Sequence, residues 1–217
     1  MQRTRSLAIG IICCSLSVAA YGQLTIDATG PIRKLRWEVQ GGSGGSAGAR
    51  IPVSVRVERT GATETAGGPI KVEFTLTNTG NSDFEIPIST QPADLEPNDP
   101  NVGYTVTDLA LSISEVAPPF KIVAMVALYG KPDVAGTMIR LAPGHSICVL
   151  AMVRFPYIPS DGTGSGRFRA LASQRHDAFT IRDGRRLLDG QDIGSSFSEE
   201  FTPQSLPYVS TCRALFQ

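Results

Sequence analysis

The residues of this chain that could serve as a catalytic base are two histidines. His145 is followed by Ser146, and His176 is followed by Asp177. A serine nucleophile needs a histidine within hydrogen-bond reach, and no Gly-x-Ser-x-Gly elbow sits on a strand-to-helix turn. Ser146 or Ser173 could meet a histidine in space, but their spacing does not favour it. The sequence therefore assigns no catalytic residue, and we expect a protein that is not an enzyme.

Carboxylates that could bind a metal ion gather in one proline-rich stretch, residues 90–103. Asp94, Glu96 and Asp99 supply the oxygen atoms that Ca²⁺ prefers. Their spacing does not match a known calcium loop, and the turn glycine is missing. The histidines and cysteines are too scattered along the chain for a zinc site. We therefore expect a surface loop here, and neither a metal nor a cofactor.

Arginines give the chain its one local excess of charge. The set comprises Arg167, Arg169, Arg175, Arg182, Arg185 and Arg186. One interpretation is a patch for an anionic partner such as a polysaccharide or a carboxylate-bearing surface. The other is the solvated face of two strands, because Phe168, Phe179 and Ile181 alternate with these charges.

The first 22 residues have the pattern of a secretory signal peptide. Arg3 and Arg5 precede an apolar run over residues 7–20, and small residues precede Gln23. An uncleaved membrane anchor is the alternative, but the run is short for a span of about 20 residues. We expect cleavage before Gln23 and a secreted or periplasmic protein.

The overall charge excludes some classes of partner. The full chain has a formal net charge of +0, and removal of the signal peptide leaves a slight acidic excess. This balance gives no attraction to nucleic acid or to an anionic membrane. No second apolar run is long enough to cross a bilayer. A protein or polysaccharide partner of unknown identity remains.

Two cysteines remain once the signal peptide, with Cys13 and Cys14, has been removed. In an oxidising compartment Cys148 and Cys212 favour a disulfide, and two buried thiols are the alternative. Cys148 lies on a strand face that carries too many apolar residues to be wet, and the C-terminal tail carries apolar residues that need to dock. The hypothesis is a bridge that fastens the tail across this face.

Short stretches of alternating residues indicate β-strands. Val72, Phe74 and Leu76 alternate with polar residues, a turn-forming cluster follows, and alternation resumes at Phe84 and Ile86. We expect a hairpin over residues 71–88. The apolar side chains of its first strand should face those of residues 147–153 across one core.

Three further patterns predict strands and turns. The alternation over residues 104–114 slips at Asp108, which predicts a β-bulge there. Residues 120–129 are apolar on both faces, and their β-rich neighbours favour a strand over a helix. Asp183 and Gly184 between two short runs predict a tight hairpin, and His176 falls in a loop before it.

These elements divide the chain into four parts. Residues 1–22 are the signal peptide, 23–49 an N-terminal arm with a Gly/Ser-rich stretch, 50–189 a β-sandwich, and 190–217 an irregular tail docked on it. The Gly/Ser-rich stretch is either a linker or a loop within one sheet. Trp37, the single tryptophan, is a core or edge anchor, or else a platform for a ligand.

Three motifs resemble those of bacterial secreted Ig-like β-sandwich domains. They are VEFTLTNTGNSDFEIPI from Val72 to Ile88, the Leu-x-Pro-Gly turn before His145, and the strand that follows Gly166. The proteinase-inhibitor-type Ig-like domain of bacilli is the most similar pattern, over roughly residues 50–185. The chain departs from it at His145, where an acidic residue is usual, and in the long loop over residues 90–103.

The expected function follows from these observations. The chain is predicted to be an all-β, Ig-like antiparallel sandwich that acts as a binding or cell-envelope interaction module. The resemblance implies an alternative, a proteinase inhibitor that acts through residues 90–103. A hydrolase built on His145 or His176 is the weaker alternative. Fold analogy alone does not decide among these functions.

Overall fold

The structure is a computed structural model that describes residues 24–31, 38–39, 49–60, 68–99, 101–118, 120–155, 166–182 and 185–207. The predicted signal peptide and Trp37 lie outside these residues. The described elements, in chain order, are β1 Thr25–Asp27, β2 Glu38–Val39, β3 Val53–Arg59, β4 Ile70–Asn78, β5 Phe84–Pro87, the 3₁₀ helix η1 Pro92–Leu95, β6 Tyr104–Glu115, β7 Ile122–Gly130, β8 Met138–Leu141, β9 Ser146–Val153, β10 Phe168–Arg182 and β11 Arg185–Phe197.

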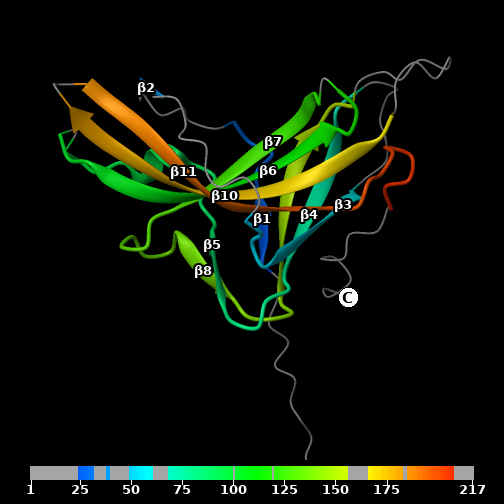
Figure 1. The fold of residues 1–217 in the computed structure, drawn as a ribbon, viewed down its shortest axis with the longest axis horizontal. Helices are drawn as coiled ribbons and strands as arrows, with labels where there is room; N and C mark the ends of the chain where they lie inside the picture. The colour runs from blue at the N-terminus through cyan, green and yellow to red at the C-terminus, as the bar shows by residue number, and fades with distance from the viewer. Residues whose placement is uncertain are drawn as a thin grey trace, which may run out of the picture.

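Two large sheets pack against each other. The short sheet has the order β1-β9-β4-β3, the long sheet has the order β2-β11-β10-β6-β7, and β5 pairs with β8 in a small third sheet. One core contains buried side chains from both large sheets, such as Phe74 and Leu111. The predicted all-β sandwich is therefore confirmed, and Figure 1 shows β10 and β11 extending well beyond β3 and β4.

β4 lies inside the short sheet, and its predicted apolar face is buried. The face that was predicted to be wet is covered too, since Glu73 is only 2% and Thr75 only 6% exposed. Val72, Phe74 and Leu76 are fully buried. Their partners on β9 are not across the core, however. Phe74 lies directly beside Val149 in the same sheet, and Leu76 lies beside Ile147. The expectation that these two strands face each other was wrong, because alternation identifies the buried face of a strand and not its neighbour.

The turn after β4 carries the chain out of the short sheet. Asn78 is fully buried, and its Nδ2 donates to the carbonyl oxygens of Ser82 and Leu141 at 2.8 and 2.7 Å. Its Oδ1 accepts from the backbone N–H of Gly80 at 2.8 Å. The following strand, β5, therefore pairs with β8 and not with β4. The strands and the turn were predicted correctly, but their pairing as a hairpin was not.

In the long sheet, β10 and β11 form a long antiparallel hairpin. Arg182 pairs with Arg185, so the connection is the predicted two-residue Asp-Gly turn, whose own residues lie outside the described part. His176 lies within β10 and not in a loop. β11 continues to Phe197, so the irregular tail does not begin at residue 190. The sequence did not predict this part of β11, because its residues are polar and both faces of the strand are partly exposed to solvent here.

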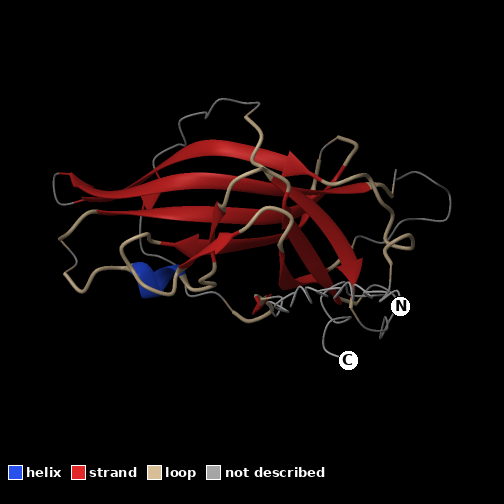
Figure 2. Ribbon diagram, turned by 90° about the horizontal axis from the view of Figure 1, so that it is seen from below, coloured by secondary structure: helices blue, strands red, loops and turns tan. Residues whose placement is uncertain are grey.

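The long sheet buries opposite faces at its two ends. Leu109 and Leu111 of β6 point into the main core, whereas Tyr104 and Val106 point to the other side. There they form a second core with Phe179 and with Leu95 of η1, which packs beside the far end of the strands (Figure 2). This change of face explains the slip in the alternation of β6.

The predicted bulge lies in a different strand. The pairing of β6 with β10 is regular through Asp108. The pairing of β10 with β11 shifts between Gln174 and Arg175, because Gln174 pairs with Gly194 and Arg175 pairs with Asp192. The extra residue is Ile193, and a bulge of this kind bends a strand.

Both flanks of the Gly/Ser-rich stretch lie along β11. Val39 pairs with Leu188, and Arg50 pairs with Ser195. The stretch between them, which is itself outside the described residues, therefore connects two positions on one sheet and is not a linker between separate units. Farther on, Phe201 pairs with Phe168, and Leu206 is buried in the main core, so the described part of the tail docks on the sandwich.

We expect Asn78→Ala to lower the free energy of unfolding by about 2 kcal/mol, because it removes the hydrogen bonds that a buried amide makes to the β4 turn and to Leu141 of β8. Urea denaturation would measure the change. The control is Asn81→Ala, which alters an exposed residue of the same turn and should change stability by less than about 0.5 kcal/mol. Equal effects of the two substitutions would contradict this account of the turn.

Candidate functional site

One face of the long sheet, here called the outer face, points away from the main core. A row across four strands consists of Met125, Ser112, Leu171 and Phe197, which lie directly beside one another. Residues in register in this way project from the same face. Met125 is 67% exposed and Phe197 is 58% exposed. Large apolar side chains thus stand in solvent on a rigid sheet.

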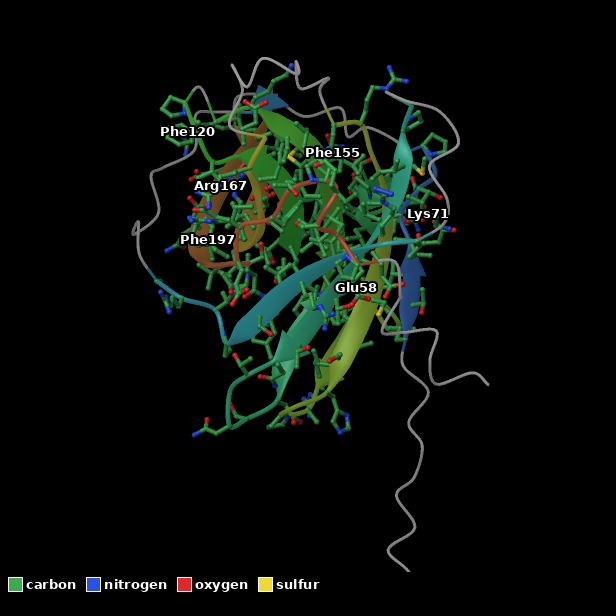
Figure 3. The ribbon with its side chains drawn as sticks, turned by 90° about the vertical axis from the view of Figure 1, so that its right-hand side faces the viewer. Glu58, Lys71, Phe120, Phe155, Arg167 and Phe197 are labelled. Atoms are coloured by element: carbon green, nitrogen blue, oxygen red, sulfur yellow. The ribbon has the colours of Figure 1, made fainter. Side chains whose placement is uncertain are left out.

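Two neighbours enlarge this exposed surface. Ile122 is 57% exposed and belongs to the adjacent row with Ser114 and Arg169. Phe120 is 60% exposed, and its φ of 55° is uncommon for a residue with a side chain. Figure 3 shows Phe120 and Phe197 on the same side of the molecule. The apolar platform is defined as Phe120, Ile122, Met125, Leu171 and Phe197.

Positive charge borders the apolar platform. The guanidinium of Arg169 lies 5.7 Å from the centre of the Phe197 ring. Arg167 and Arg169 both contact Glu200, at 3.3 and 2.8 Å, so two cations share one carboxylate. Arg167 is visible between Phe120 and Phe197 in Figure 3. Guanidinium groups are the side chains best suited to bind carboxylates.

The structure separates the other predicted arginines from these two. Arg175 contacts Asp177 and Asp192. Arg182 ends β10, roughly 40 Å along the strand from Arg169 at about 3.3 Å per residue. The side chains of Arg185 and Arg186 lie outside the described part of the chain. The six arginines therefore do not form one patch, because alternation and strand length distribute them along a hairpin.

Farther along the outer face, a group of charged side chains, some of them buried, occupies the row next to the bulge. This row contains Tyr129, Asp108, Arg175 and Asp192, with Asp177 beside it. Nε of Arg175 lies 3.2 Å from Oδ1 of Asp192, and Nη2 lies 3.6 Å from Oδ1 of Asp177. Asp108 and Asp177 are only 7% and 6% exposed. We call these five residues the bend cluster.

Burial changes the protonation of the bend cluster. The pKa of Asp108 is raised from its ordinary 3.8 to about 7, chiefly by burial and then by the charge of Asp177, while Arg175 acts in the opposite direction. Burial also raises the pKa of Asp177, again against Arg175. The pKa of Tyr129 is raised first by burial and then by Asp108 and Asp177. Oδ1 of Asp108 is buried without a hydrogen-bond partner.

The bend cluster can hold a proton at neutral pH, but it does not line either of the two pockets described next. One, of about 630 Å³, is bordered by Tyr104, Lys131 and Thr180 at the end of β6. The other, of about 430 Å³, lies between β3 and residues 198–207. The three carboxylates lie outside both pockets. Sequence reasoning missed the bend cluster, because its residues come from four strands.

The two histidines lie in different elements, His176 within β10 and His145 in the turn before β9. Nδ1 of His176 lies 3.1 Å from Oγ1 of Thr107, on the face opposite to Ser173. His145 is exposed in a turn, and Oγ of Ser146 lies 2.7 Å from Oγ1 of Thr77. The ring of His176 thus contacts Thr107 and not Ser173.

The segment over residues 90–103 is anchored in its first half. Pro92 and Leu95 are buried, and Leu95 belongs to the second core. Its exposed part begins at Asn98, and Oδ1 of Asp99 accepts from the backbone N–H of Asn101 at 2.9 Å. Across the described residues, no group of three or more His, Cys, Asp or Glu side chains could hold a metal ion.

Cys148 is fully buried on the face of β9 that was predicted to be covered. Its Sγ lies 4.0 Å from Oγ1 of Thr75 on β4. The cover does not extend along the whole strand, since Met152 on the same face is 43% exposed. Cys212 lies outside the described residues, so the Cys148–Cys212 bridge stays a prediction.

Comparisons with known proteins do not place the chain in a family. Neither the protein-family models nor the curated proteins gave a match. A solved structure titled "X-ray structure of Northeast Structural Genomics Consortium target SoR45" is 10% identical and has a TM-score of 0.30. The match covers 75% of this chain and 95% of that chain. So low a score supports no argument about fold or function.

We expect the protein to become more stable as the pH falls from about 8 to about 5. The pKa of Asp108 is about 7 in the folded chain and near 3.8 when unfolded, so the folded state binds the proton more tightly across this window. The gain should be about 2 to 3 kcal/mol. Urea denaturation at the two pH values measures it.

Asp108→Asn tests the origin of this gain. The amide has no charge to bury, so the variant should be more stable than the wild type at about pH 8 and should lose most of the gain toward pH 5. Asp83→Asn, at an exposed position, is the control. An undiminished gain in Asp108→Asn would assign the pH dependence to other groups.

A second prediction concerns Cys148. The intact mass of the unreduced mature protein should be lower than that of the reduced protein by two thiol hydrogens, with one peptide linking Cys148 to Cys212. Reduction should destabilise the chain by about 4 kcal/mol, because the bridge closes a long loop. Two free thiols in the unreduced protein would refute the bridge.

Proposed function

We propose that this chain is a secreted or periplasmic, non-catalytic binding module that recognises a protein partner through the apolar platform. The observation that supports this proposal is the exposure of Phe197 and Met125 in one row of the outer face. Contiguous apolar surface is uncommon on monomeric proteins and marks sites of interaction.

The composition of the platform favours a protein as the partner. Aromatic residues, methionine and arginine are the types enriched at the centres of protein interfaces. Ile122 and Met125 would contact apolar side chains, and Phe197 offers a ring already positioned beside Arg169. The β-strands beneath hold these side chains in fixed positions, which lowers the entropy lost on binding.

Charge indicates the rest of the partner's chemistry. Arg167 and Arg169 both contact Glu200 at the border of the apolar platform, and guanidinium groups bind carboxylates well. The expected ligand surface is an apolar patch with an aspartate or glutamate at its border. A polysaccharide would instead use the aromatic rings for stacking, and the experiment below separates the two.

The proposed location rests on the basic head and apolar run of the first 22 residues. Within the part of the chain that the structure describes, no helix has the length and apolar character needed to cross a membrane. Detection of a mature chain that begins at Gln23 in the secreted or periplasmic fraction would support the proposed location.

The binding test uses a double variant of the apolar platform, Phe197→Ser with Met125→Ser. We expect it to weaken capture of the partner from the extracytoplasmic fraction at least about tenfold, because central apolar residues carry most binding energy. Val102→Ser is the matched control, since Val102 is also exposed, at 47%, but lies before β6 at the far end of the long sheet.

Each outcome of this test bears on the proposal. Loss of the same protein band with the platform variant, and its retention with Val102→Ser, supports a protein-binding platform. Equal capture by both variants would refute it. Binding to a panel of polysaccharides that depends on Phe197 would replace the protein partner with a glycan.

A further inference from the structure

The strand β7 forms one edge of the long sheet, and its hydrogen-bonding direction can be read from a single contact. Tyr129 and Ser89 exchange two backbone hydrogen bonds, with N–O distances of 2.7 and 3.0 Å. Ser89 belongs to the segment after β5, on the side away from β6. The backbone N–H and C=O of Tyr129 therefore point out of the sheet.

Alternation extends this direction along the strand. In an antiparallel ladder every second residue directs its backbone groups to the same side, so those of Ala127 and Met125 also point outward. No described residue forms a backbone hydrogen bond to either of them on that side. The regular run ends at Val123, where the pairing with β6 shifts. With respect to the described residues, an open edge centred on Val126 remains.

The open part of this edge carries no charge or proline that would oppose pairing. Exposed edge strands are commonly protected by a lysine, another charge or a proline. β7 reads IVAMVALYG and contains none of these. Ile122 and Met125 are 57% and 67% exposed beside the open backbone groups. The edge thus combines unused hydrogen bonds with exposed apolar side chains.

We propose that β7 pairs antiparallel with β7 of a second copy of this chain, about a two-fold axis at Val126. Met125 of one copy would lie opposite Ala127 of the other, and the reverse pair follows from the symmetry. A large side chain would thus lie beside a small one at both positions. Ser89 limits the open stretch at one end, and the bulge at Val123 limits it at the other. A two-fold axis at Val126 lies midway between Met125 and Ala127, so it brings the open residues of one copy opposite those of the other.

This pairing joins two long sheets into one and places both apolar platforms on a common face. Main-chain bonds alone bury less surface than a stable dimer needs, and the exposed Ile122 and Met125 provide additional apolar area. The dimer does not rest on the proposed binding of a protein partner. It would, however, present two copies of the platform to that partner and raise its avidity.

Sedimentation velocity of the mature full-length chain over a range of concentrations tests the dimer. The wild type should dimerise, and Met125→Lys should weaken dimerisation at least about tenfold, because it places a charge at the edge. Ala127→Pro should do the same, since its N–H is not used within the sheet. Phe197→Ser is the control and should leave the dimer intact, because Phe197 lies on the face and not at the edge.

A second measurement tests the register even if one variant folds poorly. Met125→Cys and Ala127→Cys, mixed and mildly oxidised, should give a disulfide-linked heterodimer more readily than either variant alone. Each variant must melt as the wild type does. A monomeric wild type at all concentrations would overturn the proposal. So would a dimer lost in Phe197→Ser but kept in Met125→Lys, which would place association on the platform.

Discussion

The structure depends on a mismatch in length between its two large sheets. The long sheet extends beyond the short sheet, so its projecting end has no partner on the side of the main core. That end instead buries Tyr104, Val106 and Phe179 on its outer face, under Leu95 of η1. The bulge at Ile193 and the bend cluster lie where burial changes from one face to the other. There Arg175 contacts the carboxylates of Asp177 and Asp192, at a position that is only partly exposed to solvent.

The same mismatch accounts for the exposed surface. At the sandwich end, the main core takes the inner face of the long sheet, and the outer face around Met125 and Phe197 is left in solvent. Polar side chains would normally occupy such a face. The apolar residues found there do not contribute to the buried core, which is why we interpret them as an interaction surface. The open edge of β7 borders this surface and can extend it through a second copy.

Two buried polar residues contribute to the fold in opposite ways. Asn78 makes three hydrogen bonds to segments around the β4 turn, so its burial costs little and fixes the path of the chain. Asp108 keeps one oxygen without a hydrogen-bond partner, and its burial raises its pKa to about 7. The hydrogen bonds of Asn78 do not depend on pH, because its amide does not titrate. The stability of the bend does depend on pH, because Asp108 titrates.

Alternation and turn chemistry in the sequence determined where most strands lie. Val72, Phe74 and Leu76 indicated the buried face of β4, and Asp183 with Gly184 indicated the β10–β11 hairpin. Alternation repeats every two residues in any strand, so it could not show that β4 lies beside β9, that β5 pairs with β8, or that β11 runs to Phe197. The bend cluster and the apolar platform each combine residues from several strands, and only the tertiary register brings them together. A strand's own residues determine which face it buries, but contacts with distant segments decide its neighbours and therefore its sites.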